Sequence, residues 1–117
     1  MTWIRSAVLG ALVALPGIAT RADAQSADGK ALYLKNCRSC HGNSGTPSKQ
    51  ALRETPKIAK LDQAFLSSRS DDSLTTVITH GAGKDMKPFK DKLSAAEIEA
   101  VVKYVRTLGA SPPKKEP

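Results

Sequence analysis

The chain is poor in the residues that usually build the core of a small domain. Of its 117 residues only two are cysteine and 4% are aromatic, and the single tryptophan, Trp3, lies near the N-terminus. Two cysteines form at most one disulfide, so a disulfide-rich scaffold is excluded. The length allows one compact domain and no second core. We therefore expect something besides aromatic side chains to fill part of the interior.

No apolar run is long enough to cross a membrane. The longest, residues 7–19, contains one proline and two glycines and is well short of the ~20 residues that a spanning helix requires. It leads to the small-x-small pattern of residues 22–24, which is typical of a signal peptidase site. We expect residues 1–24 to be a secretory signal peptide rather than a retained anchor, and the protein to be periplasmic in a bacterium.

Acidic residues are also in short supply, with 11 of them against 18 Lys and Arg, a formal net charge of +7. A basic surface favours acidic partners and speeds their association. Nucleic acid is a poor candidate, because export would separate the chain from it and the sequence contains no recognition motif.

Both cysteines lie in one short motif, Cys37-Arg38-Ser39-Cys40-His41. A disulfide across two intervening residues would remove little entropy from the unfolded chain. A catalytic dithiol uses the same spacing, but no strand-like alternation precedes Cys37, as it would in a β-α-β unit. The adjacent histidine favours a third interpretation, because C-x-x-C-H is the attachment signature of c-type haem. Cys37 and Cys40 would then form thioethers and His41 would be an axial ligand of the iron.

A second axial ligand has two candidates in the rest of the expected mature chain. Met86 is its only methionine and lies in a loop that contains Gly83 and Pro88, between charged neighbours, which argues against simple core packing. His80 is its only other histidine, and it ends an apolar segment just before a glycine, where histidines commonly cap helices. We favour Met86, and His80 remains the alternative.

Helical patterns run through the expected mature chain, and no strand pattern or internal repeat is visible. Ser94 and Glu97 form a capping box, and apolar residues then recur at helical spacing until Gly109, which together with Pro112-Pro113 is expected to end the helix. A first helix is expected after Asp28, a middle one after Ser70 or Asp71, and a short one over residues 61–66. Residues 42–56 are rich in Gly, Ser, Thr and Pro and are expected to form a loop.

The sequence resembles the class I cytochrome c family across nearly the whole expected mature chain. Gly29 and Tyr33 are similar to the glycine and aromatic of that family's N-terminal helix, and Val101 and Tyr104 to the matching positions of its C-terminal helix. The resemblance implies that these two helices cross in close contact. It also implies that the carbonyl of Pro56 accepts the N–H of the proximal histidine, which orients the ring.

The family's methionine loop often has a proline and an aromatic directly after the methionine, and the run Met86-Lys87-Pro88-Phe89 is similar with one inserted lysine. The resemblance implies an all-α, cytochrome c-like fold of three to five helices around one covalent haem c, over residues 25–110. Residues 111–117 are polar and rich in proline, and we expect a disordered tail there.

These features predict an electron-transfer protein and not an enzyme. The expected function is a soluble mono-haem carrier that shuttles single electrons between periplasmic or membrane redox partners. Four lysines around the methionine loop would suit acidic docking surfaces, or simply form a solvated basic surface: Lys84, Lys87, Lys90 and Lys92. Two alternatives stay open, a haem subunit docked on a dehydrogenase or oxidase, and a haem sensor or peroxidase with a labile sixth ligand.

Overall fold

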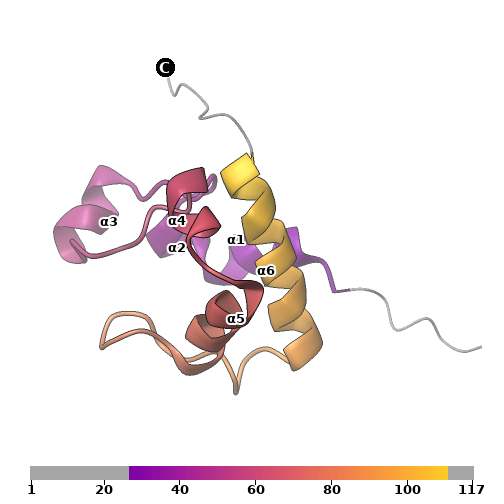
Figure 1. The fold of residues 1–117 in the computed structure, drawn as a ribbon. Helices are drawn as coiled ribbons and strands as arrows, with labels where there is room; N and C mark the ends of the chain where they lie inside the picture. The colour runs from indigo at the N-terminus through magenta and orange to yellow at the C-terminus, as the bar shows by residue number, and fades with distance from the viewer. Residues whose placement is uncertain (1–26, 111–117) are drawn as a thin grey trace, which may run out of the picture.

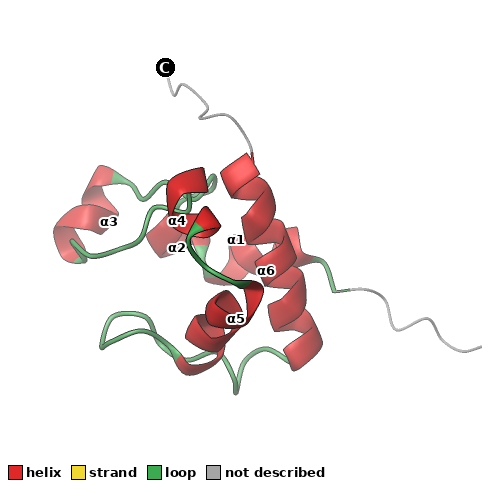
Figure 2. Ribbon diagram, in the orientation of Figure 1, coloured by secondary structure: helices red, strands yellow, loops and turns green. Residues whose placement is uncertain are grey.

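The computed structural model describes residues 27–110, and that part of the chain is helical (Figures 1 and 2). The helices are α1 (Gly29–Asn36), α2 (Arg38–His41), α3 (Lys49–Glu54), α4 (Gln63–Ser67), α5 (Asp71–His80) and α6 (Ala95–Ala110). The only β pairing among the described residues is an isolated bridge between Ala82 and Met86. The predicted all-α class is confirmed. The expected signal peptide (1–24) and tail (111–117) lie outside the described residues.

Residues 27–110 form six helical segments where three to five helices were expected, and the short segments α2 and α3 account for the difference. The four-residue turn α2 is separated from α1 by Cys37 alone. Helix α3 lies inside the segment that we predicted to be loop, residues 42–56, so that prediction was wrong there. Ser48 begins it by accepting a 3.1 Å hydrogen bond from the Ala51 N–H, and the following residues are mostly good helix formers.

Side-chain caps also begin α1, α4, α5 and α6, whereas α2 has none. The carboxylates of Asp28 and Asp62 accept from the third helical N–H of α1 and α4, and the Ser70 hydroxyl does so for α5, which settles the choice between Ser70 and Asp71. At α6 the capping box is reciprocal, since Ser94 N–H donates to the Glu97 carboxylate and Glu97 N–H to the Ser94 hydroxyl. Each cap satisfies N–H groups that the helix leaves without a partner.

Helices α1 and α6 cross at a point where only glycine fits. A Cβ atom on Gly29 would clash with the carbonyl group of Ala100 and lie 3.2 Å from Cβ of Tyr104. One turn further along α1, the ring of Tyr33 lies 5.3 Å from that of Tyr104, centroid to centroid, and Tyr33 is fully buried. The close crossing implied by the family resemblance is therefore confirmed, on the predicted residues.

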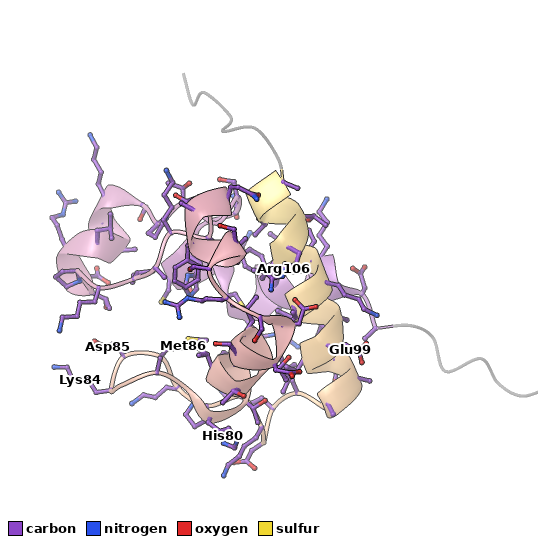
Figure 3. The ribbon with its side chains drawn as sticks, in the orientation of Figure 1. His80, Lys84, Asp85, Met86, Glu99 and Arg106 are labelled. Atoms are coloured by element: carbon purple, nitrogen blue, oxygen red, sulfur yellow. The ribbon has the colours of Figure 1, made fainter. Side chains whose placement is uncertain are left out.

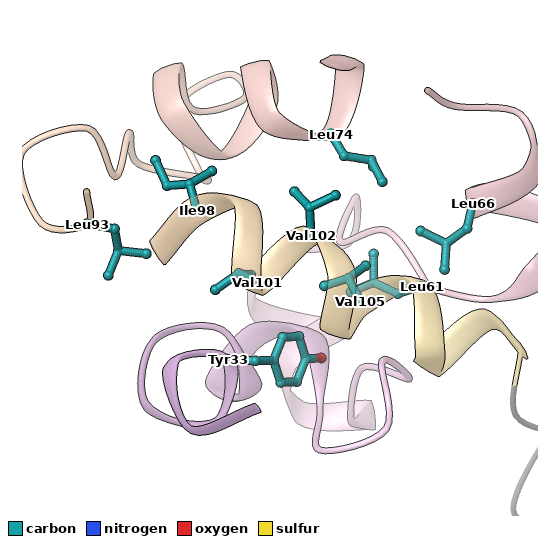
Figure 4. Packing of buried hydrophobic residues seen from close by; sticks show 9 residues of the cluster. All are labelled: Tyr33, Leu61, Leu66, Leu74, Leu93, Ile98, Val101, Val102 and Val105. Carbon is teal, nitrogen blue, oxygen red and sulfur yellow. The ribbon is translucent and has the colours of Figure 1, made fainter. Parts of the chain in front are cut away.

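The core lies along the inner face of α6, against which α1, α4 and α5 pack (Figure 4). Its buried members are Tyr33, Leu61, Leu66, Leu74, Leu93, Ile98, Val101, Val102 and Val105. Gly109 does not end this helix as predicted, because α6 continues to Ala110. A Cβ on Gly109 would meet a methyl of Leu66 at 2.5 Å, so the glycine permits α4 to approach α6.

Candidate haem site

One helical turn gathers the predicted haem-attachment residues. The Cys37 carbonyl accepts hydrogen bonds from the N–H groups of Cys40 (3.2 Å) and His41 (2.9 Å). Residues three and four positions apart in a helix share a face, so the two sulfurs and the imidazole come from one side of this turn. Both cysteines are free thiols, Cys37 half-buried and Cys40 exposed. The turn therefore presents two thiols and an imidazole together.

The second nitrogen of the His41 ring has a fixed partner. Nδ1 lies 3.1 Å from the carbonyl oxygen of Ala59, and because a carbonyl only accepts, the proton must be on Nδ1. In the neutral ring this leaves the Nε2 lone pair available to a metal. Burial lowers the pKa of His41, and the Ala59 carbonyl partly opposes the shift. The site thus favours the neutral imidazole, which is the form that binds a metal.

The structure corrects the prediction that Pro56 supplies this carbonyl. Residues 55–58 form a turn closed by a 3.2 Å hydrogen bond from Ile58 N–H to the Thr55 carbonyl. That turn leaves Pro56 exposed and brings Ala59, three residues later, to the imidazole. Since any residue carries a carbonyl, no side-chain signal in the sequence marks Ala59 for this role.

The Cys37 thiol is not tuned for disulfide exchange. Burial, with a smaller contribution from the neighbouring Cys40, raises the pKa of Cys37 to about 11. Catalytic dithiols have a lowered pKa at the attacking cysteine, because the thiolate is the nucleophile. The environment of Cys37 is the opposite of that, which weakens the redox interpretation of the motif.

The predicted Met86 loop forms a short return at the end of α5. Ala82 and Met86 exchange two backbone hydrogen bonds, of 2.9 and 3.2 Å, which close the loop at its base. Phe89 N–H then donates to the Ile78 carbonyl, so the segment after Met86 is tied to the last turn of the helix. Figure 3 shows Met86 on the side of the loop that faces the rest of the domain, and it is half-buried.

His80 lies differently. It is the last residue of α5, is exposed, and points away from the domain in Figure 3. The two candidate ligands are thus on opposite sides of the same loop. An exposed histidine at a helix C-terminus agrees with the capping role considered for it.

Several large apolar side chains pack against the core and are only partly buried by the protein. Those packed against the core in this way include Leu32, Leu34, Phe65, Ile78 and Phe89. Thiols, a neutral imidazole and a thioether are the donor set of a c-type haem, and apolar side chains suit its ring. The residues present therefore fit the group. Sequence reasoning named candidate donors but did not identify Ala59 or the hydrogen bond from the Tyr33 hydroxyl to the Gly42 carbonyl (2.7 Å).

Known proteins similar to this chain point the same way. The family profile described as cytochrome c oxidase, cbb3-type, subunit III matches residues 24–105. A cytochrome c6 of Microcystis aeruginosa is 33% identical over 67% of this chain and 90% of its own length, and a cytochrome c6 of Synechocystis sp. is 35% identical over 83% and 75%. The solved structure of the KustC0563 c-type cytochrome, 36% identical, superposes with a TM-score of 0.63 over 70% of this chain and 98% of its own.

The chain therefore belongs to the c-type cytochromes of the cbb3-type subunit III family. The predicted family and the covalent haem c cofactor are confirmed. The FixP subunit of Bradyrhizobium diazoefficiens is 27% identical over 81% of this chain, but this chain spans only 31% of that subunit. No helix among residues 27–110 is long and apolar enough to cross a membrane.

Proposed function

We propose that the protein is a mono-haem electron carrier in which Cys37 and Cys40 hold the haem through thioethers and His41 and Met86 ligate its iron. The observation that supports this most is the turn that gathers Cys37, Cys40 and His41, with Nδ1 of His41 engaged by the Ala59 carbonyl. The haem supplies one-electron chemistry between ferric and ferrous iron. This one-electron chemistry belongs to the haem and needs no acid, base or nucleophile from the protein, so we propose that the protein is not an enzyme.

The contacts of His41 and Met86 limit the structural rearrangement that accompanies electron transfer. The 3.1 Å contact with the Ala59 carbonyl holds the imidazole ring in one orientation, and the Ala82–Met86 bridge holds the methionine backbone. Ligands fixed by the fold rearrange little when the charge of the iron changes, and thioether ligation raises the reduction potential. We infer that the carrier operates toward the oxidising side of its chain of partners.

The proposed partners are redox proteins with acidic docking surfaces. Lys84, Lys87, Lys90 and Lys92 are all exposed around the Met86 loop, and two aspartates in the same segment offset only part of their charge. Such a patch would steer an acidic partner toward this side of the domain. The expected signal peptide supports a periplasmic location.

A haem subunit held on an oxidase is the second candidate, and the cbb3-type relatives favour it. The cytochrome c6 relatives favour the free carrier, because this chain covers 90% and 75% of their lengths. Purification from the native host under mild detergent conditions distinguishes a free carrier from an oxidase subunit. A free carrier elutes alone, whereas a subunit elutes with its oxidase in fixed stoichiometry.

The experiment that tests haem attachment is expression with a haem maturation system, followed by denaturing electrophoresis with haem detection. The wild type should retain covalent haem and show reduced and oxidised absorption spectra of a six-coordinate cytochrome. The double substitution Cys37→Ser with Cys40→Ser should lose the covalent haem. A wild type that matures in the same host without haem would contradict the proposal.

A further inference from the structure

The loop that presents Met86 folds back onto the glycine that ends α5. The Gly81 N–H donates a 2.7 Å hydrogen bond to the Val77 carbonyl, and Gly81 then turns with φ +79° and ψ 176°. Side chains other than hydrogen strongly disfavour this region of backbone space. The turn sends the chain outward and lets it return through the Ala82–Met86 bridge, so that the backbone of Met86 comes to lie directly against Gly81.

The backbone of residues 86–88 lies too close to Gly81 for any side chain to fit between them. A Cβ atom on Gly81 would lie 2.5 Å from the Met86 carbonyl oxygen, 2.9 Å from the Pro88 nitrogen and 3.1 Å from the Lys87 carbonyl carbon. All three are backbone atoms, so no change of rotamer relieves the contact. Cβ contacts below 3.0 Å are essentially never found, so at least one of the two segments would have to shift.

The methionine segment is the side that would move. On the other side, α5 is anchored in the core by Leu74, which is buried, and by Ile78, which packs against the core cluster. Lys87 and Pro88, which flank Met86 on its C-terminal side, are exposed, and the next backbone bond to α5 comes only at Phe89, whose N–H donates to the Ile78 carbonyl. A shift of some tenths of an ångström is large for a ligand, since metal–ligand distances hold to about 0.2 Å.

We propose that Gly81 is a positioning residue for the Met86–iron bond, and that its lack of a side chain sets the depth at which Met86 reaches the iron. The inference rests on the proposed role of Met86 as an axial ligand. It assigns to Gly81 a function beyond ending α5, because a helix can end in many residues but this contact accepts only glycine.

Gly83 provides a matched control in the same loop. It also has a positive φ, of +59°, but a Cβ atom there would meet nothing within 4 Å. Both substitutions, Gly81→Ala and Gly83→Ala, place an L side chain at a positive φ, and only the first pushes on the Met86 backbone. The comparison controls for a side chain at positive φ in this loop, and combining Gly81→Ala with Met86→Ala separates the effect on the ligand from the backbone strain at Gly81.

The test uses the ferric holoprotein and three readouts: the weak near-infrared band of sulfur–iron bonding, the affinity for added cyanide, and the reduction potential. Gly81→Ala should weaken or abolish the band, bind cyanide on the order of 10- to 100-fold more tightly than the wild type, and lower the potential. Gly83→Ala should stay close to the wild type. In a Met86→Ala background the Gly81 substitution should have no further effect on cyanide affinity.

The outcomes are distinct. A wild type without the sulfur–iron band would overturn the role of Met86, and the positioning role with it. If the wild type shows the sulfur–iron band and Gly81→Ala behaves like Gly83→Ala in all three readouts, the positioning role of Gly81 is overturned and the role of Met86 stands. A Gly81→Ala protein that fails to fold while Gly83→Ala folds would also contradict the proposal, because a loop-positioning residue should leave the α1–α6 core intact.

Discussion

The hydroxyl of Tyr33 donates a 2.7 Å hydrogen bond to the carbonyl oxygen of Gly42, the residue that follows His41. Tyr33 is fully buried between α1 and α6, so the bond connects the helix crossing to the segment that presents the imidazole. Burial is the main reason that the pKa of Tyr33 lies far above its ordinary value, and the phenol therefore stays protonated as a donor. The helix crossing and the candidate haem site are thus mechanically joined.

Tyr33→Phe removes this bond and keeps the ring. We expect the free energy of unfolding to fall by about 1 kcal/mol, because the Gly42 carbonyl is only half-buried and water can reach it. Covalent haem should be retained. Denaturant unfolding of the holoprotein measures the change, with Tyr104→Phe as the control, which should have a smaller effect. An equal loss in the two variants would contradict the link between Tyr33 and Gly42.

Gly29→Ala tests the crossing of α1 with α6. Helix propensity alone would make alanine stabilising by up to about 1 kcal/mol. The carbonyl group of Ala100 blocks the new methyl, however, so we expect destabilisation of about 1–3 kcal/mol. Gly109→Ala is the matched control on the other helix, where the obstacle is the end of a flexible Leu66 side chain. Thermal unfolding should place Gly109→Ala nearer to the wild type, and the reverse order would refute the steric argument.

Arg106 connects α6 to the segment between α4 and α5. Its guanidinium donates to the Asp71 carboxylate (2.7 Å) and to the carbonyls of Leu66 (2.5 Å) and Arg69 (2.6 Å). Arg106→Ala should cost about 1–3 kcal/mol, because it removes the hydrogen bonds of a charged donor to two carbonyls, although the Leu66 carbonyl still accepts from the Arg69 N–H. Asp71→Ala should cost less than about 1 kcal/mol, since that side chain is 70% exposed. Chemical denaturation of both variants checks the ranking, and a larger loss for Asp71→Ala would contradict it.

The sequence predicted the features that depend on neighbouring residues. The Ser94–Glu97 capping box and the Asp28 cap were confirmed because a cap is decided within one helical turn. The Gly29 and Tyr104 contact was predictable only through the family resemblance. Helix α3 was missed because it has a single buried position, Ala51, and so lacks an apolar stripe that periodicity could detect.

Contacts between backbone groups were beyond sequence reasoning. The partner of His41 depends on where the turn at residues 55–58 places its carbonyls, and one residue type is as good an acceptor as another. Gly109 was misread for a related reason. Glycine at a helix end suggests a stop, whereas here its lack of a side chain serves the approach of Leu66 from another helix.

The lysines around the methionine loop should affect the rate at which partners associate. Reversing two of them, Lys84→Glu with Lys87→Glu, should slow electron transfer to an acidic redox partner on the order of tenfold at low ionic strength. The reversal of Lys30 and Lys103, which lie at the groove between α1 and α6, is the control of equal charge. Stopped-flow measurements of the electron-transfer rate over a salt series compare the two double variants. Equal slowing in both would show that the net charge, and not the position of the lysines, determines the rate.

Met86→Ala and His80→Ala decide the second axial ligand. Met86 faces the domain from a loop closed by its own backbone bonds to Ala82, whereas His80 is exposed on the other side. We expect Met86→Ala to abolish the near-infrared sulfur–iron band, to open the iron to imidazole or cyanide, and to lower the reduction potential, because the thioether that favours ferrous iron is gone. His80→Ala should leave all three unchanged. If the His80 substitution instead alters the spin state of the iron while Met86→Ala leaves spectrum and potential untouched, the iron has two histidine ligands and the assignment of Met86 is wrong.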